Sequence, residues 1–277
     1  MASSLSQLQS FAEGLPPTER LPVLFLGHGS PMNAIENNPF VQGFRELGQK
    51  LVTPRAILCI SAHWETRGTQ VTAMKQPKTI HDFGGFPPAL YEMQYPAPGS
   101  PALAEHVQQL LTAPFRVEHD HQWGLDHGAW TVLMHLFPQA NIPVIQMSLD
   151  RTQGPEYHYA LAQQLRALRR QGVLIVGSGN MVHNLGAVAW DKLNSPYGYD
   201  WALEASAKMK EWIVNGNHDP LVAFRSQGRA FDLAIPTPEH YLPLLYCLAL
   251  QEDADEVDLF NDAPLGGSLT MTSVIYR

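Results

Sequence analysis

The chain has 277 residues, of which 45% are hydrophobic and only 16% are charged, and its formal net charge is −8. The low charged fraction, with 22 prolines and 21 glycines, excludes a coiled coil and a charge-rich disordered protein. The acidic balance argues against non-specific nucleic-acid binding, which needs a basic surface.

We expect one domain preceded by a short arm. Residues 1–20 are predicted to form a polar N-terminal arm, and no repeat or low-complexity linker interrupts residues 21–277. Four short apolar runs, each bounded by Gly, Pro or polar residues, predict strands that are buried on both faces. These runs are residues 21–26, 56–60, 142–149 and 173–176. Residues 268–276 alternate better and predict an edge or antiparallel strand.

Amphipathic or apolar segments between these runs predict helices. They cover residues 39–51, 101–112, 129–137, 155–171, 201–212 and 241–250. Strands that alternate with helices predict a single-domain αβα sandwich around a mostly parallel or mixed central sheet. The acidic run 252–258 predicts a solvated loop after the last helix. Residues 81–101, rich in Pro, Gly and aromatic side chains, predict a long ordered loop over a functional site.

Targeting signals and disulfides are not expected. No apolar run reaches the roughly 18 residues that a membrane helix needs. The first residues lack the basic and apolar regions of a secretory signal, so we expect a cytoplasmic protein without membrane contact. Cys59 and Cys247 each lie in an apolar run, which is typical of small buried side chains rather than of a disulfide framework.

Histidines follow several of the predicted strands. His28, His63 and His183 each come just after one, and ligands of open α/β sheets bind beyond the carboxyl ends of the strands. His240 precedes the last helix, with Glu239 beside it. Imidazole binds Fe, Zn, Cu and Ni well. Two or three His with at most one carboxylate are typical of a catalytic metal site, which we therefore predict at this edge.

The other histidines divide into two groups. His127 lies between Asp126 and a Gly-Ala-Trp sequence and is a candidate acid/base or hydrogen-bond donor facing the site. The remaining ones on helical or surface segments are predicted to be structural: His106, His119, His121, His135, His158 and His218. Ser178 lies in a Gly-Ser-Gly sequence, but Val176 replaces the first glycine of a nucleophile elbow, so a serine nucleophile is not expected.

Seven short motifs occur together and in order: residues 26–32, 61–66, 81–87, 95–99, 126–130, 177–184 and 237–243. In these motifs the chain resembles the class III extradiol ring-cleaving dioxygenases, and within them the bacterial and plant 4,5-DOPA extradiol dioxygenase branch. The resemblance runs from about Leu21 to the C-terminus.

The resemblance implies an αβα sandwich with one metal ion, Fe(II) in active dioxygenases, at a site that Zn(II) can also occupy. It implies His28 and His63 as ligands. Either Glu239 or His240 can be the third, and the resemblance to the DOPA branch points to His240. His183 matches the family's acid/base histidine and in this branch also reaches the metal. His127 matches a histidine near the substrate hydroxyls.

The activity implied is insertion of both atoms of O2 into a catechol ring, with L-DOPA or a related catechol cleaved at the 4,5 bond. We expect the ring to pack against the loop side chains His81, Phe83, Phe86 and Tyr95. No Lys or Arg stands out as a partner for the amino-acid carboxylate, so the sequence does not single out L-DOPA among catechols. It leaves open the oligomeric state and two other functions, a zinc-dependent hydrolase and a non-enzymatic metal-binding protein.

Overall fold

The computed structural model describes residues 18–193 and 195–277. Most of the predicted arm, residues 1–17, lies outside the described residues, so the arm stays a prediction. The described chain before the first strand is bound to the rest of the protein. The amide of Thr18 donates to the Arg170 carbonyl, and that of Leu21 donates to the Arg169 carbonyl, both at 2.9 Å.

An eight-stranded mixed sheet forms the centre, in the order β4-β3-β5-β2-β6-β1-β10-β7. Its middle consists of four mutually parallel strands. They are β1 (Val23–Gly27), β2 (Ala56–Thr66), β5 (Val144–Asp150) and β6 (Val173–Gly179). Every residue of β1, β5 and β6 is buried, and so are the first seven residues of β2, which is why the four apolar runs predicted these four strands correctly.

The outer strands are short and more polar, and the sequence analysis missed three of them: β3 (Thr69–Thr72), β4 (Val117–Asp120) and β7 (Val257–Phe260). β3 runs antiparallel to β5 and parallel to β4. β10 (Ser273–Tyr276) lies antiparallel between β1 and β7, so it is not an edge strand. The strand predicted over 268–276 is divided, because Leu269–Thr270 (β9) pairs instead with Pro264–Leu265 (β8).

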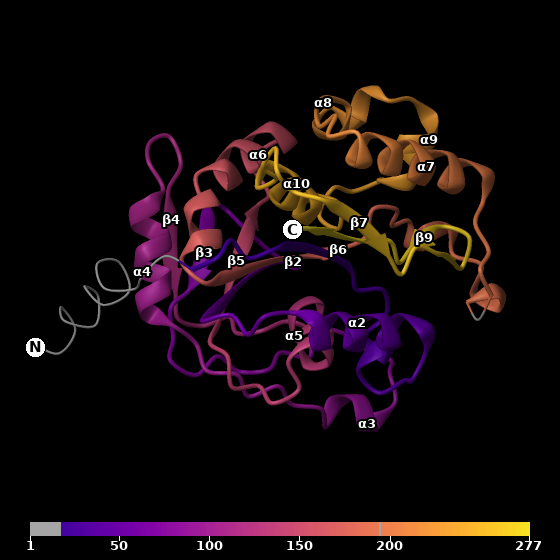
Figure 1. The fold of residues 1–277 in the computed structure, drawn as a ribbon. Helices are drawn as coiled ribbons and strands as arrows, with labels where there is room; N and C mark the ends of the chain where they lie inside the picture. The colour runs from indigo at the N-terminus through magenta and orange to yellow at the C-terminus, as the bar shows by residue number, and fades with distance from the viewer. Residues whose placement is uncertain (1–17, 194) are drawn as a thin grey trace, which may run out of the picture.

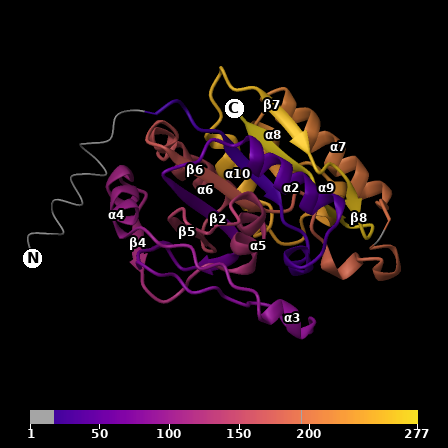
Figure 2. The ribbon, with the colours of Figure 1, turned by 60° about the horizontal axis from the view of Figure 1, so that its bottom comes forward.

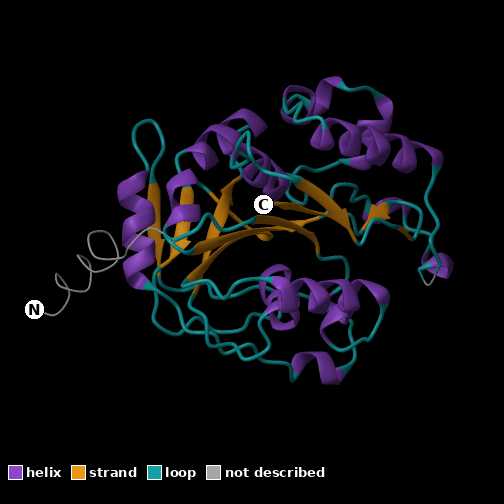
Figure 3. Cartoon of the chain, viewed as in Figure 1, coloured by secondary structure: helices purple, strands orange, loops and turns teal. Residues whose placement is uncertain are grey.

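Helices cover both faces of the sheet and confirm the αβα sandwich (Figures 1 and 3). One face packs against α4 (Pro101–Leu110), α6 (Pro155–Gln163), α7 (Asp200–Val214), α8 (Asp219–Val222), α9 (Arg229–Ala234) and α10 (Leu242–Ala249). The other packs against α2 (Pro39–Lys50), α3 (Pro88–Tyr91) and α5 (His127–Leu136). Figure 2 shows α2 and α5 side by side on this second face. In the described part of the chain, no helix combines the length and apolarity needed to cross a bilayer.

Two further predicted elements need correction. The helix predicted over 155–171 is α6 followed by a separate 3-10 turn, Arg166–Arg170. The acidic run 252–258 is not simply a solvated loop, because the Asp255 side chain is fully buried in an ion pair with Arg169. The guanidinium of Arg169 is itself buried and needs a charged acceptor, and the end of the run begins β7.

Candidate metal centre

Five histidines lie at or beyond the carboxyl-terminal ends of the central strands. His28 follows β1, and His63 lies in β2 where the pairing with β5 shifts between Ile60 and Glu65. Such a register shift re-aims side chains at the end of a strand. His183 follows β6 and forms an isolated bridge with Leu269. His127 is the first residue of α5. The fifth histidine, His240, comes directly before Tyr241, the N-cap residue of α10.

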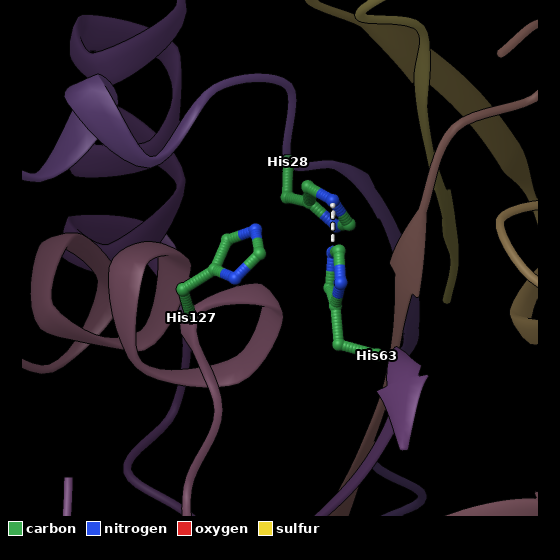
Figure 4. A group of neighbouring side chains, drawn as sticks. All are labelled: His28, His63 and His127. Carbon is green, nitrogen blue, oxygen red and sulfur yellow. Dashed lines mark hydrogen bonds between the residues drawn. The ribbon is translucent and has the colours of Figure 1, made fainter. Parts of the chain in front are cut away.

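Three of these rings face one another, as Figure 4 shows. The Nε2 atoms of His28 and His63 are 3.1 Å apart. The ring centroids of His63 and His127 are separated by 3.9 Å, and those of His28 and His127 by 5.7 Å. One ligating atom from each of the three lies within 4.8 Å of the others. The imidazoles therefore converge on one small volume.

His240 brings a second group to the same place. Its ring centroid lies 4.9 Å from that of His63 and 5.3 Å from that of His28. His183 stacks on His240 at 3.4 Å with an interplanar angle of 9°. Glu239 Oε1 lies 3.2 Å from His240 Nδ1. The two groups of converging ligand atoms thus contain five imidazoles and the Glu239 carboxylate.

The loop that carries His240 approaches β6 closely. The Asn180 amide donates to the His240 carbonyl at 2.9 Å. A Cβ on Gly179 would overlap that same carbonyl. Glycine at the end of β6 therefore lets the His240 backbone pack against the strand, which brings a residue distant in sequence beside His183.

Four of the five histidines are held neutral near neutral pH, so each has a ring nitrogen that can bind a cation. Burial, followed by the neighbouring histidines, holds the pKa values of His28 and His240 well below their ordinary value. Burial, with a further contribution from His127, lowers the pKa of His63 to about 3. Burial lowers the pKa of His183 to about 4, although Glu239 opposes the shift. These four neutral imidazoles, with the Glu239 carboxylate beside His240, form a donor set that fits a divalent transition metal.

Asp82 lies in the loop predicted over residues 81–101 and contacts two histidines of the centre. Its Oδ1 accepts a hydrogen bond of 2.8 Å from the His127 amide, and its Oδ2 lies 3.0 Å from His127 Nδ1. The same Oδ2 is 3.8 Å from His63 Nδ1. Burial alone would raise the pKa of Asp82, but its interactions with His127 outweigh burial and lower it. The sequence analysis missed this residue, and its only signal was its place in the motif 81–87.

A second carboxylate holds the start of α5. Asp126 is fully buried and accepts hydrogen bonds from Ser61 Oγ at 2.6 Å and from the Ala129 amide at 3.1 Å. It also accepts one from the Gln146 side-chain amide. Burial, followed by the nearby Asp82, raises the pKa of Asp126. Because Asp126 is the N-cap of α5, these bonds fix the position of His127.

The predicted substrate wall is only partly assembled at the centre. The Phe83 ring lies 5.6 Å from the His127 ring and 5.4 Å from the Phe86 ring. His81 contacts Phe83, but its Nε2 is 2.9 Å from the Met93 carbonyl, so it supports the loop. The structure places Tyr95 in the core, where it is 2% exposed and its hydroxyl donates to the Phe137 carbonyl.

Four of the histidines that were predicted to be structural have partners within the fold. His106 lies against Gln171, His135 against the Asn33 carbonyl, His158 against Tyr246, and His218 between Tyr159 and Gln251. None of these four is in either group of converging ligand atoms. Their contacts agree with the structural interpretation.

The architecture and the centre together define an α/β protein with a histidine-rich metal site at the strand ends. Residues 22–255 match the family model of the catalytic LigB subunit of aromatic ring-opening dioxygenase. The chain belongs to this family, the class III extradiol dioxygenases, whose members are metal-dependent enzymes that open catechol rings with O2.

Curated relatives and a solved structure agree with this assignment. A protein of Escherichia coli K12 named 4,5-DOPA dioxygenase extradiol is 47% identical over 259 residues, 92% of this chain and 94% of that protein. A protein of Beta vulgaris with the same name is 36% identical over 255 residues, 90% of this chain and 94% of that protein. A crystal structure of an uncharacterised E. coli K12 protein has a TM-score of 0.78 at 39% identity, and covers 93% of this chain and 100% of its own. The hydrolase and the non-enzymatic metal-binding protein are not favoured.

Proposed function

We propose that this protein uses Fe(II) to cleave L-DOPA, or a closely related catechol, at the 4,5 bond. The observation that carries the proposal is the meeting of five histidine side chains at the carboxyl-terminal ends of three parallel strands. The family membership and the names of the relatives agree with it. Zn(II) fits the same nitrogen donors, so we expect it to bind without supporting the reaction.

His28, His63 and His240 are the proposed metal ligands. Their rings are neighbours, and each brings a neutral nitrogen to the centre. Glu239 is proposed as the partner of His240 rather than as a ligand, because its Oε1 faces His240 Nδ1 and leaves Nε2 for the metal. When bound there, a divalent metal would lower the pKa of the catechol hydroxyls and hold catechol and O2 side by side.

His183 is the proposed acid/base. Its neutral ring can take a proton from a catechol hydroxyl and return it to the opened product. It lies flat against His240, so it reaches the same small volume as the ligands and is also a candidate fourth ligand. Stacking fixes the plane in which its ring nitrogens lie.

His127 is proposed to bind the substrate hydroxyls. The Asp82 carboxylate beside its Nδ1 favours a proton on that atom, which leaves Nε2 as a hydrogen-bond acceptor facing the centre. Asp82 belongs to the same loop as Phe83 and Phe86, which we propose as the wall for the aromatic ring. One carboxylate therefore holds His127 beside the loop that carries Phe83 and Phe86.

Oxygen consumption after metal reconstitution tests the proposal. The protein is stripped of metal, reconstituted anaerobically with Fe(II) or Zn(II), and mixed with L-DOPA in aerated buffer while O2 and the yellow ring-opened product are followed. We expect both signals with Fe(II) and neither with Zn(II). No O2 uptake with L-DOPA or any other catechol, despite stoichiometric Fe(II) binding, would contradict it.

A further inference from the structure

Ser178 lies between the strands that carry two of the proposed ligands. It is fully buried in β6, in register with Leu26 on β1 and with Ser61 on β2. These neighbours precede His28 and His63 by two residues each. The Ser178 side chain points to the face of the sheet covered by α5, where its Oγ meets the Gly128 carbonyl.

The hydrogen bonds of Ser178 determine the protonation of a neighbouring ring. A serine hydroxyl has one proton, and a carbonyl oxygen can only accept, so this proton is donated to Gly128. Ser178 Oγ also lies 3.0 Å from His28 Nδ1. With its proton committed, the hydroxyl can only accept there, so the ring nitrogen must be the donor. His28 therefore carries its proton on Nδ1, and its Nε2 presents a lone pair.

We infer that Ser178 is a positioning residue that fixes the tautomer and orientation of His28 for metal binding. Nε2 of His28 is the atom 3.1 Å from His63 Nε2, so the selected lone pair points at the centre. A second hydrogen-bond partner on the far nitrogen of a ligating histidine is typically worth 10- to 100-fold in metal affinity. The inference rests on the proposed function only in taking His28 as a ligand.

The same hydroxyl connects His28 to the helix that carries His127. Gly128, whose carbonyl accepts the Ser178 proton, is the residue after His127 in the first turn of α5. A ligand on β1 and a substrate-facing histidine on α5 are thus held by one buried atom on β6. Ser178 is not activated as a nucleophile, because its proton is donated to a carbonyl oxygen and not to a base. Its hydrogen bonds to Gly128 and His28 give the serine a positioning role instead.

Metal titration of Ser178→Ala tests the inference without requiring turnover. We expect the affinity of the metal-free protein for Zn(II) to fall by about 10- to 100-fold. Ser148→Ala is the matched control, because Ser148 is an equally buried strand serine with hydrogen bonds to Thr66 and Gln70 and none to a histidine. It should bind Zn(II) as the unaltered protein does. Equal affinities for Ser178→Ala and the unaltered protein would overturn the inference.

Nuclear magnetic resonance gives a second test that needs no variant. In the metal-free protein labelled with heavy nitrogen in histidine, the His28 resonances should show a proton on Nδ1 and none on Nε2. His28→Ala identifies those resonances by their loss. A His28 ring protonated on Nε2 would refute the inference even if Ser178→Ala did not fold. Neither measurement depends on ring cleavage, so a failed dioxygenase assay would leave this result standing.

Discussion

Gly128→Ala is the sharpest structural perturbation of the centre. A Cβ at this position would lie 2.5 Å from Ser61 Oγ and 2.8 Å from His63 Cδ2. Ser61 is held by its hydrogen bond to Asp126, so the strain falls on the His63 ring. Overpacking of this kind typically costs about 1–3 kcal/mol. Alanine in a helix gains at most about 1 kcal/mol over glycine, so we expect a net loss of roughly 1 kcal/mol.

A loss of metal affinity in Gly128→Ala would show that the added Cβ displaces His63 and does not only destabilise the fold. Displacement of His63 should lower the affinity for Zn(II) by about 10-fold, as changes beside metal ligands do. The assay combines urea unfolding of the metal-free protein with Zn(II) titration. Gly186→Ala is the control, since the nearest atom to its Cβ is Asn184 Oδ1 at 3.4 Å, an ordinary contact. A Gly128→Ala protein more stable than the unaltered one, with unchanged affinity, would refute the reasoning.

Three further predictions concern the proposed base, a buried ion pair and pH. His183→Ala should lower turnover by about 10²- to 10⁴-fold in the O2 assay, and retained turnover would exclude its role as acid/base. Asp255→Ala leaves the buried charge of Arg169 without its partner and should cost roughly 3–5 kcal/mol in urea unfolding, so a loss below about 1 kcal/mol would contradict the buried pair. Burial lowers the pKa of His158 to about 4, so the unfolded chain protonates first, and stability should fall as the pH drops from about 6.5 towards 4. The fall should be smaller in His158→Gln, and identical pH profiles of the unfolding midpoint would contradict this.

The sequence predicted the middle of the sheet much better than its edges. The four central strands are continuous apolar runs because both of their faces are buried. β3 and β4 are four residues long and mostly polar, and β7 begins inside an acidic run. Their pairing comes from neighbouring strands that are distant in sequence, and no local pattern shows it.

The histidines were easier to predict than the groups that position them. His28, His63 and His183 could be chosen because each follows a recognisable strand, and parallel strands bring their ends to one edge. Asp82 could not, since it reaches His127 from a loop 45 residues away in sequence. The sequence analysis considered Ser178 only as a nucleophile. Its positioning role depends on a hydrogen bond to the Gly128 carbonyl in α5, which no sequence motif reveals.

Labelled dioxygen gives the most direct test of the central claim, that the histidine centre opens a catechol ring with O2. The Fe(II)-reconstituted protein is mixed with L-DOPA under O2 made of the heavy oxygen isotope, and the ring-opened product is analysed by mass spectrometry as soon as it forms. The account predicts a product that carries both atoms of the labelled O2. An unopened catechol, or a product whose added oxygen comes only from water, would contradict it.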